Sequence, residues 1–372
     1  MAAQPRTQEE YYVEQNGQPP EKERRGFFAN LGCATLVAIA LFIILILIVL
    51  ICLIIFFTVG RREVADNEAT QAFLKGANQA PEISGAGRLV TVGFVETALV
   101  KNSQKICLLD ASYLNPNRIQ QFEKEHIKGA RHFDIDAVTF STPTQRRNLK
   151  HPLDFQAYVR ELGIDSDCHV VVYAHEDRQA DKRMSINAAT YVWWLFKVYG
   201  LDNVSVMDGG LDEWKSKDRE VPLETGAAPK PGRKGDFVAR WRPEYIITFD
   251  DVKEALVTNQ YKLVDSRSLA QFDGRDKHQL AAQAGRIKGA VNLPTTNLMR
   301  QNGLFKAPGA LLNEFEQQGI TGKQPIIVYC NTAFQASTVY FAAYTLDLPG
   351  RLYDGSWVEW SKRADDSLKI LG

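Results

Sequence analysis

The feature that most constrains the fold of this 372-residue chain is an internal repeat. Three short sequences recur in the same order nearer the C-terminus. The matched pairs are residues 108–112 with 263–267, 127–130 with 287–290, and 206–214 with 352–360. Ordered self-similarity of this kind indicates a duplicated domain, so we expect two domains that share one architecture.

The pattern inside each copy predicts the fold class. Short apolar, β-branched runs, such as residues 169–173 and 326–329, alternate with stretches of helical character. Buried strands separated by helices are typical of parallel sheets. We therefore predict an α/β protein with two tandem domains, each a parallel sheet flanked by helices. Ligands of such sheets bind at the carboxyl ends of the strands.

One cysteine lies at such a strand end. Cys330 follows the apolar run 325–329 and precedes a predicted helix from about residue 334 to 346. The unpaired amides of a helix N-terminus stabilise a thiolate and can lower the pKa of a cysteine from about 8.5 to about 3.5–7.5. A buried cysteine that packs as a small hydrophobic side chain is the alternative, and the local sequence favours neither.

Four motifs together give the chain a specific resemblance. They are an Asp-Ser-Arg strand end, a Gly-Arg-Ile-Lys-Gly-Ala segment, the Tyr-Cys loop, and Tyr-Asp-Gly-Ser-Trp-Val-Glu-Trp near the C-terminus. From about Leu89 onward the chain resembles tandem rhodaneses, the two-domain sulfurtransferase family that includes thiosulfate and 3-mercaptopyruvate sulfurtransferases. The alternating α/β pattern described above is consistent with that fold.

The resemblance implies a reaction and its residues. Cys330 would take sulfur from a small donor, thiosulfate or 3-mercaptopyruvate, as a persulfide and pass it to a thiol or cyanide. The backbone amides of the following loop would bind the anionic persulfide. The predicted substrate-binding loop consists of Asn331, Thr332, Ala333, Phe334, Gln335 and Ala336. We expect neither a cofactor nor a metal.

The first copy lacks the nucleophile. Its strand Val172-Tyr173 continues into Ala174, where the second copy has Cys330. The resemblance implies that this copy is non-catalytic and closes one side of the active-site cleft. Relatives that act on phosphate esters carry an arginine six residues after the cysteine, and here that residue is Ala336, which argues against a phosphatase.

The sequence leaves the donor open. The loop has Asn-Thr-Ala after the cysteine, whereas thiosulfate-type relatives tend to carry Arg-Lys and mercaptopyruvate-type relatives Gly-Ser-Gly. Gln271 occupies the place of the family's anion-binding arginine. Arg275 is a candidate substitute, with an ordinary surface arginine as the alternative. His126 matches a position implicated in proton handling in mercaptopyruvate-type relatives, with a structural histidine as the alternative.

Composition shifts divide the chain into six predicted segments. They are a disordered tail at 1–26, a transmembrane helix at 27–59, a stalk at 60–88, the non-catalytic domain at 89–221, a linker at 222–243 and the catalytic domain at 244–372. The tail is rich in Gln, Glu, Pro and Arg, and Pro and Gly mark the linker.

The membrane prediction depends on an absence of charge. Residues 26–60 contain no charged side chain, and the apolar run exceeds the ~20 residues that span a bilayer. It is also longer than the core of a signal peptide, so we expect a single-pass anchor. Lys22, Arg24 and Arg25 precede the span, and two arginines follow it. This slightly favours domains outside the cytoplasm, although a reactive thiol in an oxidising compartment needs a reducing partner.

Cysteine spacing and net charge argue against further classes of site and function. Five cysteines without paired or metal-like spacing predict neither a disulfide framework nor a zinc site, and Cys107 and Cys168 flank predicted buried strands. The net charge of zero gives no case for nucleic-acid binding. The competing hypothesis is a membrane-tethered binding or scaffold protein with little turnover, and the neutral loop and Gln271 are the features that favour it.

Overall fold

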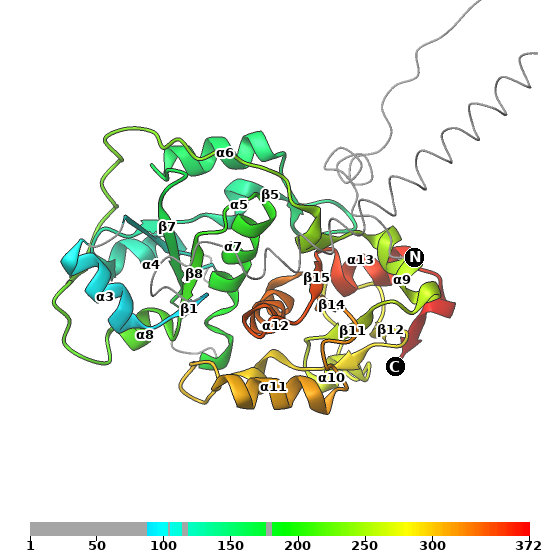
Figure 1. Cartoon of the computed structure of the whole chain (residues 1–372). Coiled ribbons are helices and arrows are strands. Elements are labelled where there is room, and N and C mark those ends of the chain that lie inside the picture. Colours follow the sequence, from blue (N-terminus) through cyan, green and yellow to red (C-terminus); the bar gives the residue numbers. More distant parts are fainter. Residues whose placement is uncertain (1–87, 103–104, 114–117, 176–180) are drawn as a thin grey trace, which may run out of the picture. The chain divides into compact units, whose positions relative to one another are not determined.

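The computed structural model describes residues 88–102, 105–113, 118–175 and 181–372 (Figure 1). The predicted tail and transmembrane helix, and the predicted stalk up to residue 87, lie outside these ranges. Within them, no helix is both long and apolar enough to cross a membrane.

The first copy contains a five-stranded parallel sheet with the strand order β1-β8-β7-β2-β4. Its strands are β1 (Leu89–Val90), β2 (Ile106–Asp110), β4 (Arg131–His132), β7 (His169–Tyr173) and β8 (Val204–Met207). Its helices are α3 (Val92–Lys101), α4 (Arg118–Lys124), α5 (Ile135–Val138), α6 (Pro152–Glu161), α7 (Asn187–Val198) and α8 (Gly210–Trp214).

The second copy repeats this sheet with the order β10-β15-β14-β11-β13, again parallel. Its strands are β10 (Ile246–Ile247), β11 (Lys262–Asp265), β13 (Val291–Asn292), β14 (Ile326–Tyr329) and β15 (Gly350–Tyr353). Its helices are α9 (Phe249–Thr258), α10 (Leu269–Phe272), α11 (Pro308–Gln317), α12 (Phe334–Thr345) and α13 (Ser356–Arg363). The predicted α/β fold with two parallel sheets flanked by helices is therefore confirmed.

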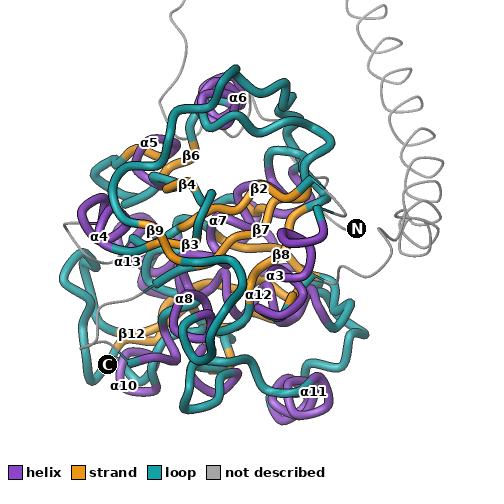
Figure 2. Tube along the Cα trace, turned by 90° about the vertical axis from the view of Figure 1, so that its left-hand side faces the viewer, coloured by secondary structure: helices purple, strands orange, loops and turns teal. Residues whose placement is uncertain are grey.

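Short antiparallel pairs complete each copy. They are β3 (His126–Ile127) with β9 (Leu223–Glu224), β5 (Thr139–Phe140) with β6 (Asn148–Leu149), and β12 (Gly285–Ile287) with β16 (Lys369–Leu371). Figure 2 shows β3 beside β9, which lies in the segment predicted as the linker.

The two copies match down to single hydrogen bonds. The Tyr173 hydroxyl accepts from the Ile127 N–H at 3.3 Å, and the Tyr329 hydroxyl accepts from the Ile287 N–H at 3.2 Å. In both copies a tyrosine at the end of the central strand thus holds the strand that begins the Ile-Lys-Gly-Ala motif. The sequence repeat is therefore a structural repeat.

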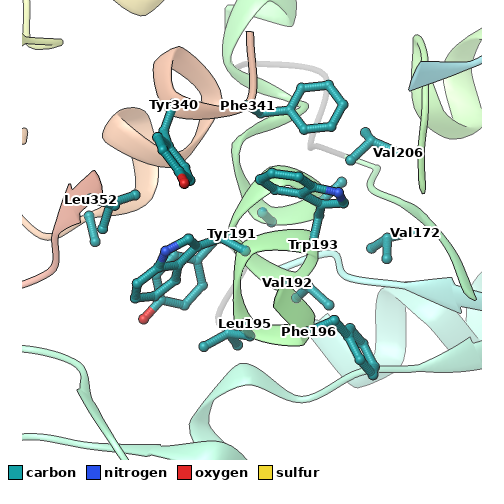
Figure 3. Packing of buried hydrophobic residues seen from close by; sticks show 14 of the residues in the cluster. Val172, Tyr191, Val192, Trp193, Leu195, Phe196, Val206, Tyr340, Phe341 and Leu352 are labelled. Carbon is teal, nitrogen blue, oxygen red and sulfur yellow. The ribbon is translucent and has the colours of Figure 1, made fainter. Parts of the chain in front are cut away.

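Helices α7 and α12 join the two copies through a shared core. Every residue of α7 is buried, as expected for a helix that is apolar around most of its circumference. Trp193 of α7 meets Phe341 of α12 edge-on, with ring centroids 4.8 Å apart (Figure 3). Beside them the Thr190 hydroxyl lies 2.9 Å from the Ser337 hydroxyl and 2.8 Å from the Thr338 hydroxyl. These hydrogen bonds satisfy buried polar groups between the copies.

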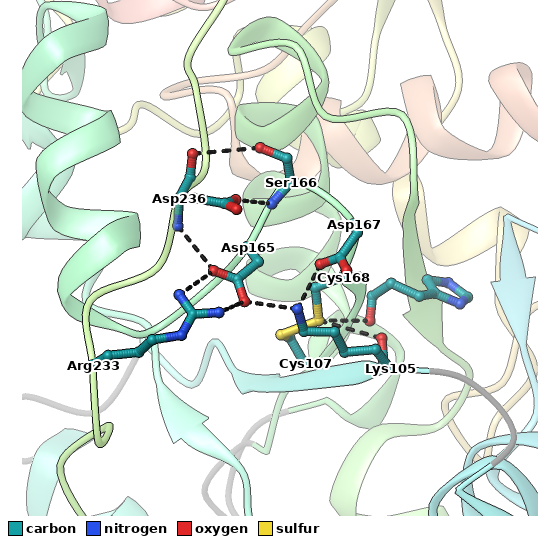
Figure 4. The surroundings of a disulfide bond; sticks show 9 residues. Lys105, Cys107, Asp165, Ser166, Asp167, Cys168, Arg233 and Asp236 are labelled. Atoms are coloured by element: carbon teal, nitrogen blue, oxygen red, sulfur yellow. Dashed lines mark hydrogen bonds and ion pairs between the residues drawn. A yellow bond between two sulfur atoms is a disulfide. The ribbon is translucent and has the colours of Figure 1, made fainter.

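A disulfide corrects the prediction made from cysteine spacing. Cys107 in β2 and Cys168, directly before β7, are bonded, with their Cα atoms 6.0 Å apart (Figure 4). The two residues are 61 positions apart in sequence, so spacing gave no signal. They meet because β2 and β7 are neighbours in the sheet.

The segment between the copies lies against the first copy. Arg233 Nη2 lies 2.6 Å from Asp165 Oδ2, and Lys105 Nζ lies 2.7 Å from the same oxygen (Figure 4). The Asp236 N–H donates to Asp165 Oδ1 at 2.9 Å. Hydrogen bonds from Arg233 and Lys105 hold the pKa of Asp165 below its ordinary value. The segment is thus fixed near its middle by one carboxylate.

Candidate active site

Cys330 lies directly after β14, whose four residues are all buried between β11 and β15. The cysteine is 2% exposed and is the only free cysteine among the described residues. The structure thus places the predicted nucleophile at the carboxyl end of a central strand.

Ser356 holds the backbone on both sides of this strand end. Its hydroxyl accepts from the N–H of Cys330 at 3.2 Å and of Ala333 at 3.3 Å. It donates to the Tyr353 carbonyl at 2.9 Å. The Trp357 N–H donates to the Cys330 carbonyl at 2.8 Å. The start of α13 therefore fixes the position of the cysteine.

Residues 331–336, which we call the carrier loop, turn around the Cys330 sulfur. Ala333 has a left-handed backbone conformation with φ 72°, directly before α12 begins at Phe334. The Thr332 N–H points at the sulfur, with nitrogen and Sγ 3.4 Å apart. The amides of Gln335 and Ala336 also donate to the sulfur. Three inward-facing amides therefore surround the thiol, as a nest for an anion requires.

The loop amides do not lower the pKa of Cys330 below its ordinary value. Burial raises the pKa of the Cys330 thiol above its ordinary value, because the charged form loses its hydration. Hydrogen bonds from Ala336, Thr332 and Gln335 act in the opposite direction, and the charge of Asp265 adds to the rise. The local sequence indicated the amides correctly but gave no measure of the burial.

Arg267 lies close to the thiol but is already paired. Its Nε donates to the two Asp265 oxygens at 2.9 and 3.1 Å, and its Nη2 donates to the Gly285 carbonyl at 2.8 Å. The guanidinium carbon lies 5.3 Å from the centroid of the Trp357 ring. Arg267 is 1% exposed, and its donors are largely used in fixing the end of β11.

The two positions considered for binding the donor's anionic group differ in location. Gln271 accepts a hydrogen bond from Asn331 Nδ2 at 2.9 Å, so it contacts the carrier loop. Arg275 is exposed and lies 3.1 Å from Asp273. In the described residues no hydrogen bond or ion pair joins Arg275 to the carrier loop. This arrangement favours the alternative of a surface arginine.

His126 lies within the first copy. It is 1% exposed, its Nδ1 lies 2.8 Å from the Phe122 carbonyl, and its ring stacks on the Phe122 ring with centroids 3.9 Å apart. Its Nε2 lies 3.8 Å from a Glu224 oxygen. These contacts favour the alternative of a structural histidine.

Three residues of the first copy contact the carrier loop, and sequence reasoning singled out none of them. Arg147 donates from Nη1 to the Thr332 carbonyl at 3.2 Å. The rings of Tyr113 and Tyr191 lie 5.1 and 4.8 Å from the ring of Phe334. The local sequence does not distinguish these residues from their neighbours. Arg146 and Arg147, for example, are adjacent, and only Arg147 is buried.

The arrangement suits covalent chemistry at sulfur. It supplies one thiol, three amides for an anionic sulfur, and side chains from the first copy beside the loop. In the described part of the chain, no group of three or more His, Cys, Asp or Glu side chains could hold a metal ion. The equivalent strand end of the first copy keeps its hydrogen bond, from the Leu211 N–H to the Ala174 carbonyl at 3.2 Å, but has no sulfur.

Comparisons with known proteins agree with this geometry. Residues 96–217 and 248–363 match the rhodanese-like domain family. The chain is 34% identical over 285 residues to 3-mercaptopyruvate sulfurtransferase of Homo sapiens, covering 74% of this chain and 92% of that protein. It is 32% identical over 269 residues to thiosulfate sulfurtransferase of Rattus norvegicus, covering 71% and 87%.

A solved structure gives the same result. The crystal structure of the 3-mercaptopyruvate sulfotransferase SseA from Escherichia coli has 31% sequence identity and a TM-score of 0.63. The match covers 73% of this chain and 99% of that one. All three relatives carry the name of a sulfur-group transferase, which favours an enzyme over the scaffold hypothesis.

Proposed function

Because this chain belongs to the rhodanese family and is a sulfurtransferase, we propose that Cys330 is the residue that carries the transferred sulfur. One observation supports this assignment above the others. The amides of Thr332, Gln335 and Ala336 converge on the Cys330 sulfur at the end of β14. A terminal persulfide sulfur is anionic near neutral pH, and inward-facing amides stabilise an anion.

The proposed reaction has two balanced steps. The Cys330 thiolate attacks the outer sulfur of the donor and forms an S–S bond, while the donor's own bond to that sulfur breaks. Thiosulfate leaves as sulfite, and 3-mercaptopyruvate leaves as pyruvate after taking up a proton. An acceptor thiol or cyanide then attacks the outer sulfur, and the Cys330 thiolate is released.

The carrier loop is proposed to bind the donor as well as the persulfide. Asn331 and Phe334 are nearly buried, while Thr332 and Gln335 are partly exposed. The small side chains of Ala333 and Ala336 allow their amides to approach. Thiosulfate and 3-mercaptopyruvate both remain candidate donors, because relatives named for each are similar to the chain to nearly the same degree.

The first test is direct detection of the persulfide. We expect the reduced, full-length protein to gain the mass of one sulfur on the peptide that contains Cys330 when it is mixed with thiosulfate or 3-mercaptopyruvate. Cyanide or a thiol should remove that mass. Cys330→Ser is the control and should gain nothing. A folded protein with a reduced Cys330 that gains no sulfur from either donor would contradict the assignment.

We also propose that residues 27–59 anchor the protein in a membrane, with both rhodanese-like domains outside the cytoplasm. The uncharged run at 26–60 and the slight excess of basic residues before it support the anchor and its direction. The Cys107–Cys168 disulfide supports the same side, since disulfides persist in oxidising compartments and are rare in the cytosol.

A further inference from the structure

The first copy places a buried cation beside the catalytic loop. Arg147, directly before β6, is 8% exposed. Its Nη1 donates to the Thr332 carbonyl at 3.2 Å, and its guanidinium carbon lies 4.1 Å from the centroid of the Phe334 ring. Thr332 and Phe334 belong to the carrier loop around the Cys330 sulfur. The charge of Arg147 therefore lies against the site, although it comes from the copy without a nucleophile.

The hydrogen-bonding capacity of this guanidinium is only partly used. Arg147 Nε is buried without a hydrogen-bond partner, and no ion pair joins Arg147 to a carboxylate in the part of the chain that the structure describes. The buried carboxylate nearby, Asp354, accepts from Gln145 Nε2 at 2.7 Å. Burying a cation without a direct ion pair is costly, so such an arrangement indicates a negatively charged partner.

A second unpaired donor lies at the same aromatic ring. Tyr191 of α7 is fully buried and stacks on Phe334, with ring centroids 4.8 Å apart and planes at 25° (Figure 3 shows Tyr191). Its hydroxyl has no hydrogen-bond partner among the described residues. Buried hydroxyls are normally paired, so this one adds to the evidence for a polar ligand beside Phe334.

Arg267 and Arg275 of the second copy are less suited to bind an anionic ligand at the carrier loop. Arg267 donates to both oxygens of Asp265 and to a backbone carbonyl, and its Nη1 donates to the Asn331 side-chain oxygen of the carrier loop at 3.5 Å. Arg275 is exposed and pairs with Asp273, and Gln271 is uncharged. Among these guanidinium groups of the described residues, that of Arg147 is the one with a buried donor that has no hydrogen-bond partner.

We propose that Arg147 binds the carboxylate or sulfonate of the sulfur donor while Cys330 takes its sulfur, and this proposal rests on the sulfurtransferase function above. A guanidinium presents a planar fork of donors that matches the oxygens of either group. The donor class is then a small molecule with an oxyanion a few bonds from its transferable sulfur. The non-catalytic copy determines donor choice, and the second copy carries out the sulfur transfer.

The test compares donors that carry an oxyanion with one that does not. Single-turnover loading of Cys330 in the full-length protein is measured with thiosulfate, with 3-mercaptopyruvate, and with the hydropersulfide of 2-mercaptoethanol, which lacks an oxyanion. In Arg147→Gln the concentration for half-maximal loading by the two oxyanion donors should rise about 10-fold to 100-fold, as expected for lost hydrogen bonds to a charged group. Loading by the hydropersulfide should fall far less, and Arg147→Lys should recover part of the loss.

The matched control is Arg146→Gln, which removes the same charge from the exposed neighbour. Its loading by all three donors should equal that of the unmodified protein. Equal losses in Arg147→Gln for donors with an oxyanion and for the hydropersulfide would show that Arg147 only supports the Thr332 carbonyl, and would overturn the proposal. Loading of Arg147→Gln that equals loading of the unmodified protein with all three donors would overturn the proposal as well.

A binding measurement separates this proposal from the function on which it rests. Pyruvate and sulfite, the anions released from the two donors, are titrated into Cys330→Ser by calorimetry, alone and combined with Arg147→Gln. Binding that disappears with Arg147→Gln supports the anion site even if the unmodified protein forms no persulfide. Equal binding of pyruvate and sulfite with and without Arg147→Gln, or no binding to either protein, contradicts the proposed anion site.

Discussion

At the scale of single residues, the chemistry of Cys330 is set by two opposing effects. Burial raises the pKa of the thiol, and three loop amides partly offset that rise. Burial therefore disfavours the thiolate form of the resting residue, although the surrounding donors suit an anion. Such a site stabilises the persulfide once it has formed more than it activates the free thiol beforehand.

The raised pKa predicts how the free thiol responds to pH. Only the thiolate reacts, so the rate of Cys330 alkylation by iodoacetamide should increase about tenfold per unit from about pH 7 to about pH 9, with no plateau in that range. Mass spectrometry of the Cys330 peptide measures this rate, and a small thiol such as glutathione is the reference. A plateau reached below about pH 7 would mean that the amides outweigh burial.

At the scale of secondary-structure elements, the Cys107–Cys168 disulfide ties β2 to the start of β7 at the centre of the first sheet. Cross-linking residues 61 positions apart restricts the unfolded chain. The β5 and β6 region of the same copy brings Arg147 to the carrier loop.

Loss of this bond should lower stability. The double variant Cys107→Ala, Cys168→Ala is expected to lose about 2–4 kcal/mol of unfolding free energy, measured by chemical denaturation. A reductant should destabilise the unmodified protein to a similar extent and leave the double variant unchanged. If both cysteines react with an alkylating reagent before any reduction, the pair is not bonded.

Local features of the sequence predicted the elements but not the contacts between them. The strand before Cys330 and the helix after it follow from neighbouring residues, and the repeat predicted the second sheet. The Cys107–Cys168 bond depends on strand order, which spacing does not encode. Arg147 reaches Thr332 across 185 positions of sequence, and nothing near Arg147 distinguishes it from the exposed Arg146. Burial, which decides the pKa of Cys330, is likewise a property of the assembled fold.

At the scale of the whole molecule, the two copies act as one unit through α7 and α12. The described residues of both copies belong to one compact unit, and one hydrophobic cluster contains residues of both copies, including Trp193 and Phe341. The candidate active site also draws on both copies, since the carrier loop of one meets the arginine and tyrosines of the other.

The proposed anchor and its direction predict the result of a protease-protection experiment. In sealed microsomes that contain the full chain, protease added outside should digest an epitope in residues 1–26, on the cytoplasmic face, and spare the fragment with Cys330. Detergent should expose that fragment, and alkaline carbonate should not extract the protein. A version without residues 27–59 is the control and should be extractable.

The reverse result, a protected epitope and digested domains, would place the catalytic part in the cytoplasm. Extraction of the full chain by carbonate would argue against the anchor itself.

The meeting of Arg147 with the carrier loop has a consequence for how such an enzyme changes over evolutionary time. In the proposed arrangement the second copy holds both the nucleophile and the loop amides around its sulfur. The first copy has no cysteine at the matching position, so mutations in it can alter which donor is accepted while leaving Cys330 and its loop unchanged. With the proposed roles of Arg147 and Cys330, the duplicated fold offers separate places in which selectivity and reactivity can evolve.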